Sequence, residues 1–218
     1  MEVACERGQL YEFEAGSAGL LCVDYQTDFL SERGMCASRG LPVAALGRVL
    51  QPSQAVLAAA RRKGLFVAHM RESYSADLSD LNAFRSARDK IIGAPGPLGR
   101  FLIRGERGTE IVSAMAPRPS EPVIDKAGFN GFHATVLDEL LRSRGVSHLL
   151  IMGITTQCCI SSTLRGAVDH GYFPLVVADC CAAWDEQDHL ASLRVIYSEN
   201  HQFGWVSDSA RVLAALGT

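Results

Sequence analysis

Two adjacent cysteines, Cys158 and Cys159, follow an apolar run that passes through Gly153. Beyond them, apolar residues recur with helical spacing at positions 160, 164, 167 and 168, so the segment from residue 148 predicts a strand, a tight turn and a helix. At such a turn, the free N–H groups of the helix and the positive end of its dipole favour an anion. We therefore expect a thiol here to have a lowered pKa and to act as a thiolate nucleophile.

Two further reactive side chains close apolar runs elsewhere in the chain. Asp24 ends residues 19–24, and Lys126 ends residues 121–126. Each type alone is commonplace, because an aspartate after a strand is usually a turn residue, a lysine is usually solvated and a buried cysteine is usually inert. The carboxyl ends of parallel strands, however, line the ligand crevice of an open α/β sheet. We therefore expect Asp24, Lys126 and Cys159 to meet there as a catalytic site.

Elementary chemistry assigns a role to each of these three groups. A free thiol with a pKa near 8.5 is mostly protonated at neutral pH and needs a base or a stabilising field. Asp24 is expected to take the proton, while Lys126 orients the carboxylate and favours the thiolate. Cys159 would attack an amide-like carbonyl, Asp24 would return the proton to departing ammonia, and water would hydrolyse the thioester-like intermediate.

The spacing Gly153-x-x-Thr156-x-x-Cys159 resembles the signature of the isochorismatase-like cysteine hydrolases. Residues 21–29, Leu-Cys-Val-Asp-Tyr-Gln-Thr-Asp-Phe, look like the first strand of this family, and residues 123–126, Val-Ile-Asp-Lys, look like the segment that supplies its lysine. The similarity covers residues 18–206 and leaves the first 17 residues and the tail uncovered. It implies that Cys159, rather than Cys158, is the nucleophile.

An oxyanion formed by attack on a carbonyl needs hydrogen-bond donors. The backbone N–H groups of Thr155 and Cys159 are the expected pair, and the resemblance implies that the Ile154–Thr155 peptide bond is cis. The sequence departs from the family pattern at Gln157, where an acid is frequent, and at Cys158, where an apolar residue is usual.

The same three catalytic residues serve several reactions in this family. Nicotinamidases carry an Asp-x-His-type metal cluster after the second strand, whereas this chain has only His69 there, so we predict no metal and no cofactor. Family members that cleave the enol ether of isochorismate lack the nucleophilic cysteine. The loops look more like those of biuret and triuret hydrolases and of ureidoacrylate hydrolases, which implies hydrolysis of a small linear ureido compound, biuret-type first, with release of ammonia.

A ureido substrate needs hydrogen-bond donors, acceptors and an apolar wall. We expect Gln202 to supply both amide atoms, Phe29 and Tyr25 to form the wall, and Arg71 to hold a second carbonyl. Each also has a simpler interpretation as a core, salt-bridged or surface residue.

The composition is that of an ordinary globular protein. The chain has 218 residues, 48% of them hydrophobic and 21% charged, and a net charge of −3, which predicts one domain and gives no reason to expect nucleic acid as a partner. Seven cysteines without metal-type spacing favour a reduced, cytoplasmic protein, and no run is long enough to span a membrane. The resemblance implies a homo-oligomer, a dimer or tetramer.

Strand and helix patterns alternate along the chain, which predicts a three-layer α/β/α fold with a mainly parallel sheet of about six strands. The whole chain is expected to form a single domain, with residues 1–17 as an N-terminal extension. The expected strands are residues 19–24, 65–70, 121–126, 149–152, 174–179 and 203–206. The expected helices are residues 43–63, 81–90, 134–144, 187–199 and 209–216, together with one after Cys159.

Two other functional classes remain open at this point. A catalytically idle binding member of the fold would be indifferent to the loss of Cys159. A redox sensor built on Cys158–Cys159 and Cys180–Cys181 would respond to thiol oxidation. The presence of all three expected catalytic residue types favours the hydrolase.

Overall fold

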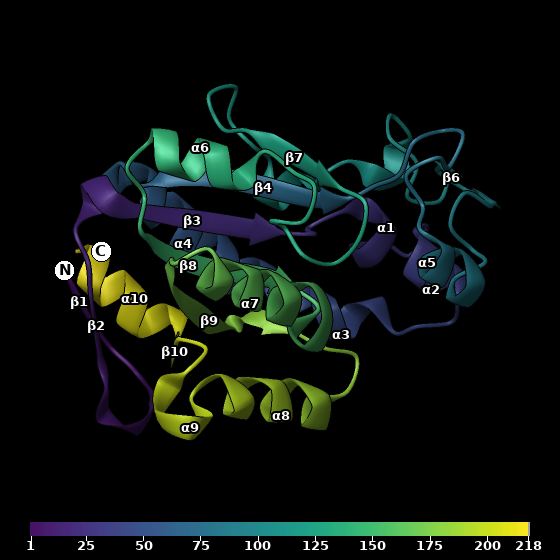
Figure 1. Cartoon of the computed structure of the whole chain (residues 1–218). Coiled ribbons are helices and arrows are strands. Elements are labelled where there is room, and N and C mark those ends of the chain that lie inside the picture. Colours follow the sequence, from purple (N-terminus) through teal and green to yellow (C-terminus); the bar gives the residue numbers. More distant parts are fainter. Residues whose placement is uncertain (218) are drawn as a thin grey trace.

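The chain is built around one six-stranded sheet in which all neighbouring strands are parallel (Figure 1). The computed structural model describes residues 1–217. The parallel sheet of about six strands expected from the sequence is therefore confirmed. In chain order its strands are β3 (Ala18–Val23), β4 (Phe66–Glu72), β7 (Val123–Lys126), β8 (His148–Ile154), β9 (Phe173–Ala182) and β10 (Trp205–Ser207).

Helices connect and cover these strands, as the alternating pattern predicted. None of the helices in residues 1–217 is long and apolar enough to cross a membrane. They are α1 (Thr27–Leu30), α2 (Met35–Ser38), α3 (Val43–Gly47), α4 (Leu50–Lys63), α5 (Ala83–Arg88), α6 (Leu137–Ser143), α7 (Ser161–Asp169), α8 (Glu186–Ile196), α9 (Ser198–His201) and α10 (Ser209–Leu216).

The order of the strands across the sheet is β10-β9-β8-β3-β4-β7. The first strand of this sheet along the chain, β3, lies in the middle. The chain then adds β4 and β7 on one side of β3, and afterwards β8, β9 and β10 on the other side. The direction of winding therefore changes between β3 and β8. In open α/β sheets, ligands bind outside the carboxyl ends of the strands at such a switch point.

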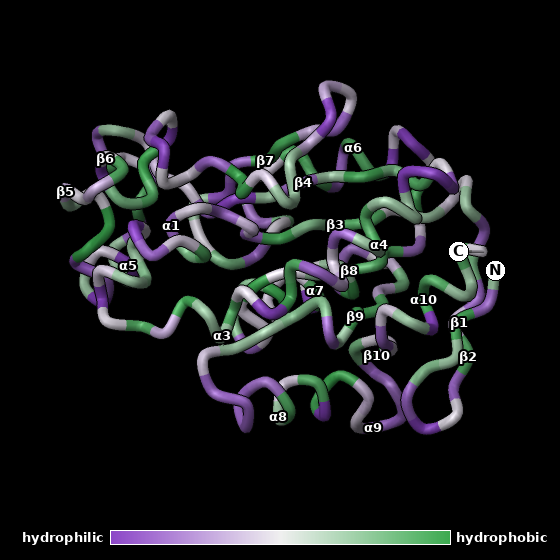
Figure 2. The backbone as a smooth tube through the Cα atoms, turned by 180° about the vertical axis from the view of Figure 1, so that it is seen from behind, coloured by the Kyte–Doolittle hydropathy of each residue, from purple (hydrophilic) through white to green (hydrophobic). Residues whose placement is uncertain are grey.

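Successive side chains of a strand point to opposite faces, and each face of the sheet has its own apolar layer. Leu20 and Cys22 of β3 belong to the layer that α4 and α10 cover. Leu21 and Val23 belong to the layer that α6, α7 and α8 cover. The hydrophobic colouring of β3 in the middle of Figure 2 reflects this position, since all its residues are buried. The three-layer α/β/α prediction is confirmed.

One helix differs from its expected form. The pattern at residues 43–63 predicts a single helix, but the structure has α3 and α4 with a break between them. Pro52 lies in the first turn of α4, where its missing N–H group costs no helical hydrogen bond, so a continuous helix through this point is disfavoured. Gly64 ends α4 in the left-handed conformation with φ 79°, as its position predicted.

The first 17 residues pack onto the sheet. They form an antiparallel hairpin of β1 (Glu2–Ala4) and β2 (Leu10–Glu12), with two short 3₁₀ turns, η1 (Glu6–Gly8) and η2 (Ala15–Ser17). Tyr11 is buried in the hairpin, and its hydroxyl donates to the carbonyl of Phe173 at 2.7 Å. This segment therefore contributes to the layer that α4 and α10 cover.

A separate apolar cluster caps the carboxyl ends of the strands. The segments α1, α2, α5 and β6 gather at this end of the sheet (Figure 1). The buried Asp28 joins them, because its carboxylate accepts hydrogen bonds from the N–H groups of Met35 at 3.1 Å and Leu102 at 2.8 Å. The remaining cap elements are β5 (Pro95–Gly96), β6 (Gly99–Arg100), η3 (Arg107–Thr109) and η4 (Ser113–Met115).

Candidate active site

The structure brings Asp24, Lys126 and Cys159 together at the carboxyl ends of their strands. Lys126 Nζ donates to Asp24 Oδ2 at 2.8 Å and lies 3.5 Å from Cys159 Sγ. It also donates to the carbonyl of Gly128 at 2.8 Å. The three side chains are buried, with exposed fractions of 5% or less. The convergence expected from the three strand ends is therefore what the structure has.

Asp24 is held by backbone geometry as well as by Lys126. It follows β3 in the left-handed region, with φ 58°, and its N–H group donates to Met70 of β4 at 2.8 Å. Its second oxygen, Oδ1, accepts the Glu72 N–H at 2.9 Å. Burial raises the pKa of the Asp24 carboxyl, and the Glu72 charge adds to this, although Lys126 acts in the opposite direction. Asp24 is therefore a stronger base than a solvated aspartate.

The short segment η5 (Thr156–Ile160) places Cys159. It is one wide π-helical turn, in which the Thr155 carbonyl accepts the N–H groups of Cys158 at 3.1 Å and Ile160 at 3.2 Å. Such turns are frequent at functional sites. Thr156 anchors the turn, because its hydroxyl lies 2.8 Å from Nδ1 of the buried His189 on α8.

The electrostatics of Cys159 differ from the sequence expectation. A hydrogen bond with the Cys158 thiol, burial and the Asp24 charge raise the pKa of Cys159 well above its ordinary value, while Lys126 lowers it. The pKa of the neighbouring Cys158 thiol is lowered by the same hydrogen bond, so the thiol pair as a whole does not show the lowering expected for Cys159 from the helix terminus. Transfer of the thiol proton needs a nearby base, and the raised pKa of Asp24 meets that need.

The peptide bond Ile154–Thr155 is cis, as the resemblance implied. Just before it, Gly153 adopts φ 140° at the point where β8 passes β3. A Cβ atom here would lie 2.0 Å from the carbonyl oxygen of Val23, so only glycine allows β8 to run this close to the strand that carries Asp24.

A cavity of about 300 Å³ opens beside these groups. Aromatic side chains supply much of its wall, and charged side chains lie among them. The wall includes Phe29, Phe129, Trp184, Thr155 and Cys159, and the charged residues are Asp24, Arg39, Glu72, Arg85 and Asp89.

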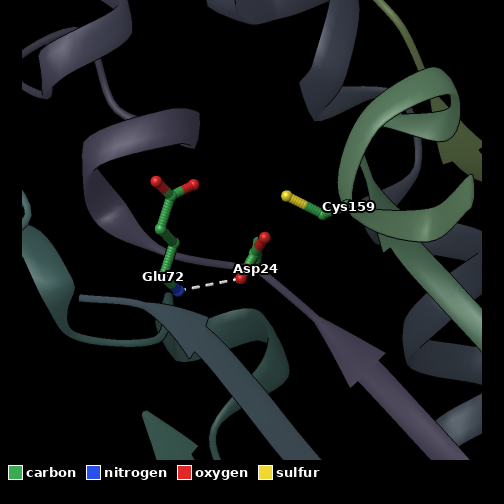
Figure 3. A group of neighbouring side chains, drawn as sticks. All are labelled: Asp24, Glu72 and Cys159. Carbon is green, nitrogen blue, oxygen red and sulfur yellow. Dashed lines mark hydrogen bonds between the residues drawn. The ribbon is translucent and has the colours of Figure 1, made fainter. Parts of the chain in front are cut away.

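Glu72 ends β4 and faces Cys159 across this cavity. One oxygen each of Asp24 and Glu72 and the sulfur of Cys159 all lie within 4.8 Å of one another. Figure 3 shows the Glu72 carboxylate and the Cys159 thiol on either side of Asp24, directed into the same space. The Glu72 carboxylate accepts hydrogen bonds from Tyr74 at 2.8 Å and Arg85 at 2.5 Å.

Asp24, Glu72 and Cys159 are also the side chains that could serve as ligands for a metal ion. The Lys126 ammonium already supplies positive charge to Asp24 and Cys159, so a cation would compete with it. His69 lies inside β4 and pairs with Glu121 at 3.1 Å, which fits its expected structural role. The expectation of no metal cofactor stays a prediction.

The predicted substrate contacts are brought together only in part. Phe29 lines the cavity, but Tyr25, Arg71 and Gln202 do not. Tyr25 is buried in the core, where its hydroxyl bonds to Ser53 at 2.6 Å and to the Cys180 carbonyl at 3.0 Å. These three expectations are corrected.

Arg71 and Gln202 lie elsewhere because of strand geometry. Arg71 precedes Glu72 in β4 and therefore points the other way, toward Asp125 of β7, with Nε at 2.5 Å from Oδ1. Gln202 is exposed and follows α9 just before β10 begins, so it lies at the amino ends of the parallel strands. The cavity lies at their carboxyl ends.

Glu72, Arg85, Phe129 and Trp184 line the cavity and were missed from the sequence. For Glu72 a signal existed, because it ends an apolar strand in the same way as Lys126, with which it pairs in register. The other three come from loops and the short helix α5, whose positions no periodic pattern indicates.

The strand motif that begins at Asp24 now has a physical account. Gln26 fixes the end of β4, since its side chain accepts the Glu72 N–H at 2.6 Å and donates to the Glu72 carbonyl at 2.9 Å. Asp28 fixes the cap above the cavity, and Phe29 forms part of the cavity wall. The polar residues Gln26 and Asp28 of this motif thus fix the segments on either side of Asp24.

A family model described as the isochorismatase domain matches residues 18–211. The chain belongs to the isochorismatase family. This confirms the resemblance that the spacing of Gly153, Thr156 and Cys159 indicated.

Similar proteins cover almost the whole of this isochorismatase-family chain. The ureidoacrylate amidohydrolase RutB of Pantoea ananatis is 30% identical in an alignment of 224 positions, gaps included, that covers 99% of this chain and 88% of that protein. The RutB of Methylorubrum extorquens is 32% identical in an alignment of 218 positions, gaps included, that covers 94% of this chain and 85% of that protein. The crystal structure of a cysteine hydrolase from Pseudomonas syringae has a TM-score of 0.82 at 26% identity, covering 94% of this chain and 95% of that one.

Proposed function

We propose that this protein is a cysteine-dependent amidohydrolase that cleaves a C–N bond of a small linear ureido compound and releases ammonia. The observation that carries the proposal is the buried Lys126 ammonium, 2.8 Å from Asp24 and 3.5 Å from Cys159 at the edge of a cavity. Family membership and the ureidoacrylate amidohydrolases among the relatives support hydrolysis of an amide C–N bond.

In the first half of the reaction, Asp24 takes the proton of the Cys159 thiol. The sulfur attacks the carbonyl carbon and forms the C–S bond, and the carbonyl oxygen becomes the oxyanion of a tetrahedral intermediate. The C–N bond breaks when this intermediate collapses. Asp24 then gives its proton to the leaving nitrogen, which departs as ammonia. Lys126 remains protonated, because the Asp24 charge raises its pKa although burial alone would lower it.

In the second half, a water molecule gives a proton to Asp24 and attacks the thioester-like intermediate. The C–S bond breaks, the proton returns to sulfur, and the product leaves as a carbamate or carboxylate. The N–H groups of Thr155 and Cys159 are the proposed donors to the oxyanion in both halves. Both residues line the cavity.

Among ureido compounds, we propose ureidoacrylate as the first substrate to test, because the similar RutB proteins are named for it. Biuret and triuret are the alternatives that the loop sequences favoured. The charged groups of the cavity are paired, with Arg85 bound to Glu72 at 2.5 Å and Arg39 bound to Asp89 at 3.0 Å. This balance of charge, with the aromatic wall, suits a flat ureido group beside Cys159.

The test is ammonia release by the purified protein from ureidoacrylate, biuret, triuret, nicotinamide and simple carboxamides. The matched control variants are Cys159→Ser and Cys158→Ser. Turnover of a ureido compound that is lost only in Cys159→Ser supports the proposal. Turnover of nicotinamide or plain amides alone would retain the nucleophile but refute the substrate class, and equal activity in Cys159→Ser would refute both.

A further inference from the structure

The Glu72 carboxylate has one oxygen that is used within the protein and one that is not. Both of its side-chain hydrogen bonds, from Tyr74 at 2.8 Å and Arg85 at 2.5 Å, end on Oε1. No group within residues 1–217 forms a hydrogen bond with Oε2. Glu72 is 3% exposed and lines the cavity, so Oε2 is an acceptor with little access to bulk water.

Hydrogen bonds to the Glu72 backbone and contacts of its partner Arg85 fix the position of this carboxylate. Its backbone is bound by Asp24 and Gln26, and its partner Arg85 is stacked over the ring of Phe129 at 4.4 Å from the centroid. A salt bridge between Arg85 and Asp89 at 3.5 Å adds a further restraint. The carboxylate therefore presents Oε2 in one direction before any ligand enters.

We propose that Glu72 Oε2 accepts a hydrogen bond from the N–H group that flanks the scissile carbonyl and so selects ureido compounds. The inference rests on the proposed function. A carbonyl carbon positioned for attack lies about 3–3.5 Å from the sulfur. Because a carboxylate oxygen of Glu72 lies within 4.8 Å of Cys159 Sγ, the nitrogens of that substrate lie within hydrogen-bonding reach of Glu72.

The selectivity follows from the chemistry of an ionised carboxylate, which only accepts hydrogen bonds. A ureido N–H group satisfies Oε2, whereas an ester-type oxygen at the same position leaves it unpaired and facing another acceptor. Sites that hydrogen-bond a substrate group discriminate strongly against an analogue that lacks it. An anionic end of the substrate is also expected to point away from Glu72, toward the Arg39 side of the cavity.

The test compares ureidoacrylate with carbamoyloxyacrylate, in which oxygen replaces the bridging N–H group. Both finally release ammonia, so kcat/KM is measured by the same assay. In carbamoyloxyacrylate the enolate oxygen leaves more easily than a nitrogen, and the ammonia comes from the carbamate formed afterwards. Each kcat/KM is therefore divided by the rate constant of the same compound with a free thiol. For the wild-type protein we expect a corrected preference of about 10- to 100-fold for the ureido compound, the usual strength of a hydrogen bond to a charged group.

Glu72→Gln gives a sharp prediction because Tyr74 and Arg85 both donate to Oε1. The glutamine carbonyl must take that position, so an NH₂ donor replaces Oε2. We expect the preference to disappear or to reverse toward carbamoyloxyacrylate. Glu72→Asp keeps the charge, but its shorter side chain moves the carboxylate away from the substrate, so it should also weaken the preference. This variant replaces Glu72→Gln in the test if Glu72→Gln fails to fold.

The matched control is Asp138→Asn on α6. Asp138 likewise accepts from a tyrosine, Tyr172 at 2.8 Å, and from an arginine, Arg142 at 2.9 Å, but lies outside the cavity. It should keep the wild-type preference. An unchanged preference in folded Glu72→Gln, with both rates lowered equally, would overturn the inference alone. A wild-type protein that hydrolyses neither compound nor any other ureido compound would overturn the proposed function and the inference with it.

Discussion

Lys126 Nζ lies 2.8 Å from Asp24 Oδ2, although 102 residues separate the two in the chain. Both side chains are almost completely buried, with exposed fractions of 1% and 0%. A buried ion pair is costly to break, because removal of one partner leaves the other charge without solvent or counter-ion.

Lys126→Met should therefore abolish activity and lower the free energy of unfolding by about 3 kcal/mol. The double variant Asp24→Asn/Lys126→Met should be equally inactive yet more stable than Lys126→Met, since no unpaired charge remains. Denaturant unfolding of the wild-type protein, the two single variants Lys126→Met and Asp24→Asn, and the double variant measures this. Stability losses that simply add up would show that the two charges do not interact.

The acid limb of the pH–rate profile should report Asp24. Burial and the Glu72 charge raise the pKa of its carboxyl, and only the ionised form can take the thiol proton. Activity should therefore fall, as the pH is lowered, at a pH above the value near 3.9 of an ordinary aspartate. Glu72→Gln removes a like charge and should move this limb to lower pH. A limb that stays in place or moves upward would contradict the assignment.

Gly153→Ala should disrupt the site through its backbone. The new Cβ atom would lie 2.0 Å from the Val23 carbonyl oxygen, so β8 must move away from β3 and carry Thr155 and Cys159 with it. We expect a loss of at least about 3 kcal/mol in stability, comparable to severe core overpacking. Activity should fall by at least about 100-fold, since small displacements of reacting groups cost this much.

Gly171→Ala is the control for this prediction, and it should be folded and active. Gly171 also has a positive φ, 84°, but no atom lies within 4 Å of the added Cβ, so only the conformational cost of about 1–2 kcal/mol applies. Thermal unfolding and kcat/KM of the two variants separate the two effects. Equal behaviour would mean that the contact with Val23 is unimportant.

Glu121 should contribute to stability in a pH-dependent way. Burial opposes its ionisation, but hydrogen bonds from Arg61 at 2.7 and 2.8 Å outweigh this and lower its pKa from 4.5 to about 2. A lowered folded-state pKa gives stability that is present above pH 4.5 and is lost as the pH falls toward 2. Glu121→Gln should cost about 1–2 kcal/mol at pH 7. This loss in the free energy of unfolding should become smaller as the pH is lowered. The substitution should leave kcat/KM unchanged. A loss that is independent of pH would contradict this account.

Much of the fold followed from local sequence signals. The strands of a doubly covered sheet are continuous apolar runs, and each one ends where a polar residue begins, so Asp24, Lys126 and Cys159 could be assigned to one edge. The apolar run through Gly153 and the helical spacing beyond it added the turn. These predictions needed only the parallel arrangement of the strands, whereas the choice of Cys159 over Cys158 came from the family resemblance.

The wall of the cavity could not be predicted in the same way. Arg71 and Glu72 are neighbours in β4, and the alternation of the strand decides which one faces Cys159. The sequence favoured Arg71, whereas the structure has Glu72 there. Tyr25 looked equally available, but its hydroxyl satisfies Ser53 and the Cys180 carbonyl inside the core. The raised pKa of Cys159 likewise depends on the hydrogen bond with the Cys158 thiol, on burial and on Asp24, and only the folded chain combines these three effects.

The measurement that tests the central claim most directly is the mass of the enzyme quenched in acid during turnover of its ureido substrate. The account predicts an adduct equal to the substrate minus ammonia, located by peptide mapping on Cys159 and absent from Cys158. It should also be absent from Cys159→Ser and should accumulate in a variant slow in the hydrolytic half. A fully active enzyme that carries its adduct on another residue would contradict the assignment of Cys159 as the nucleophile.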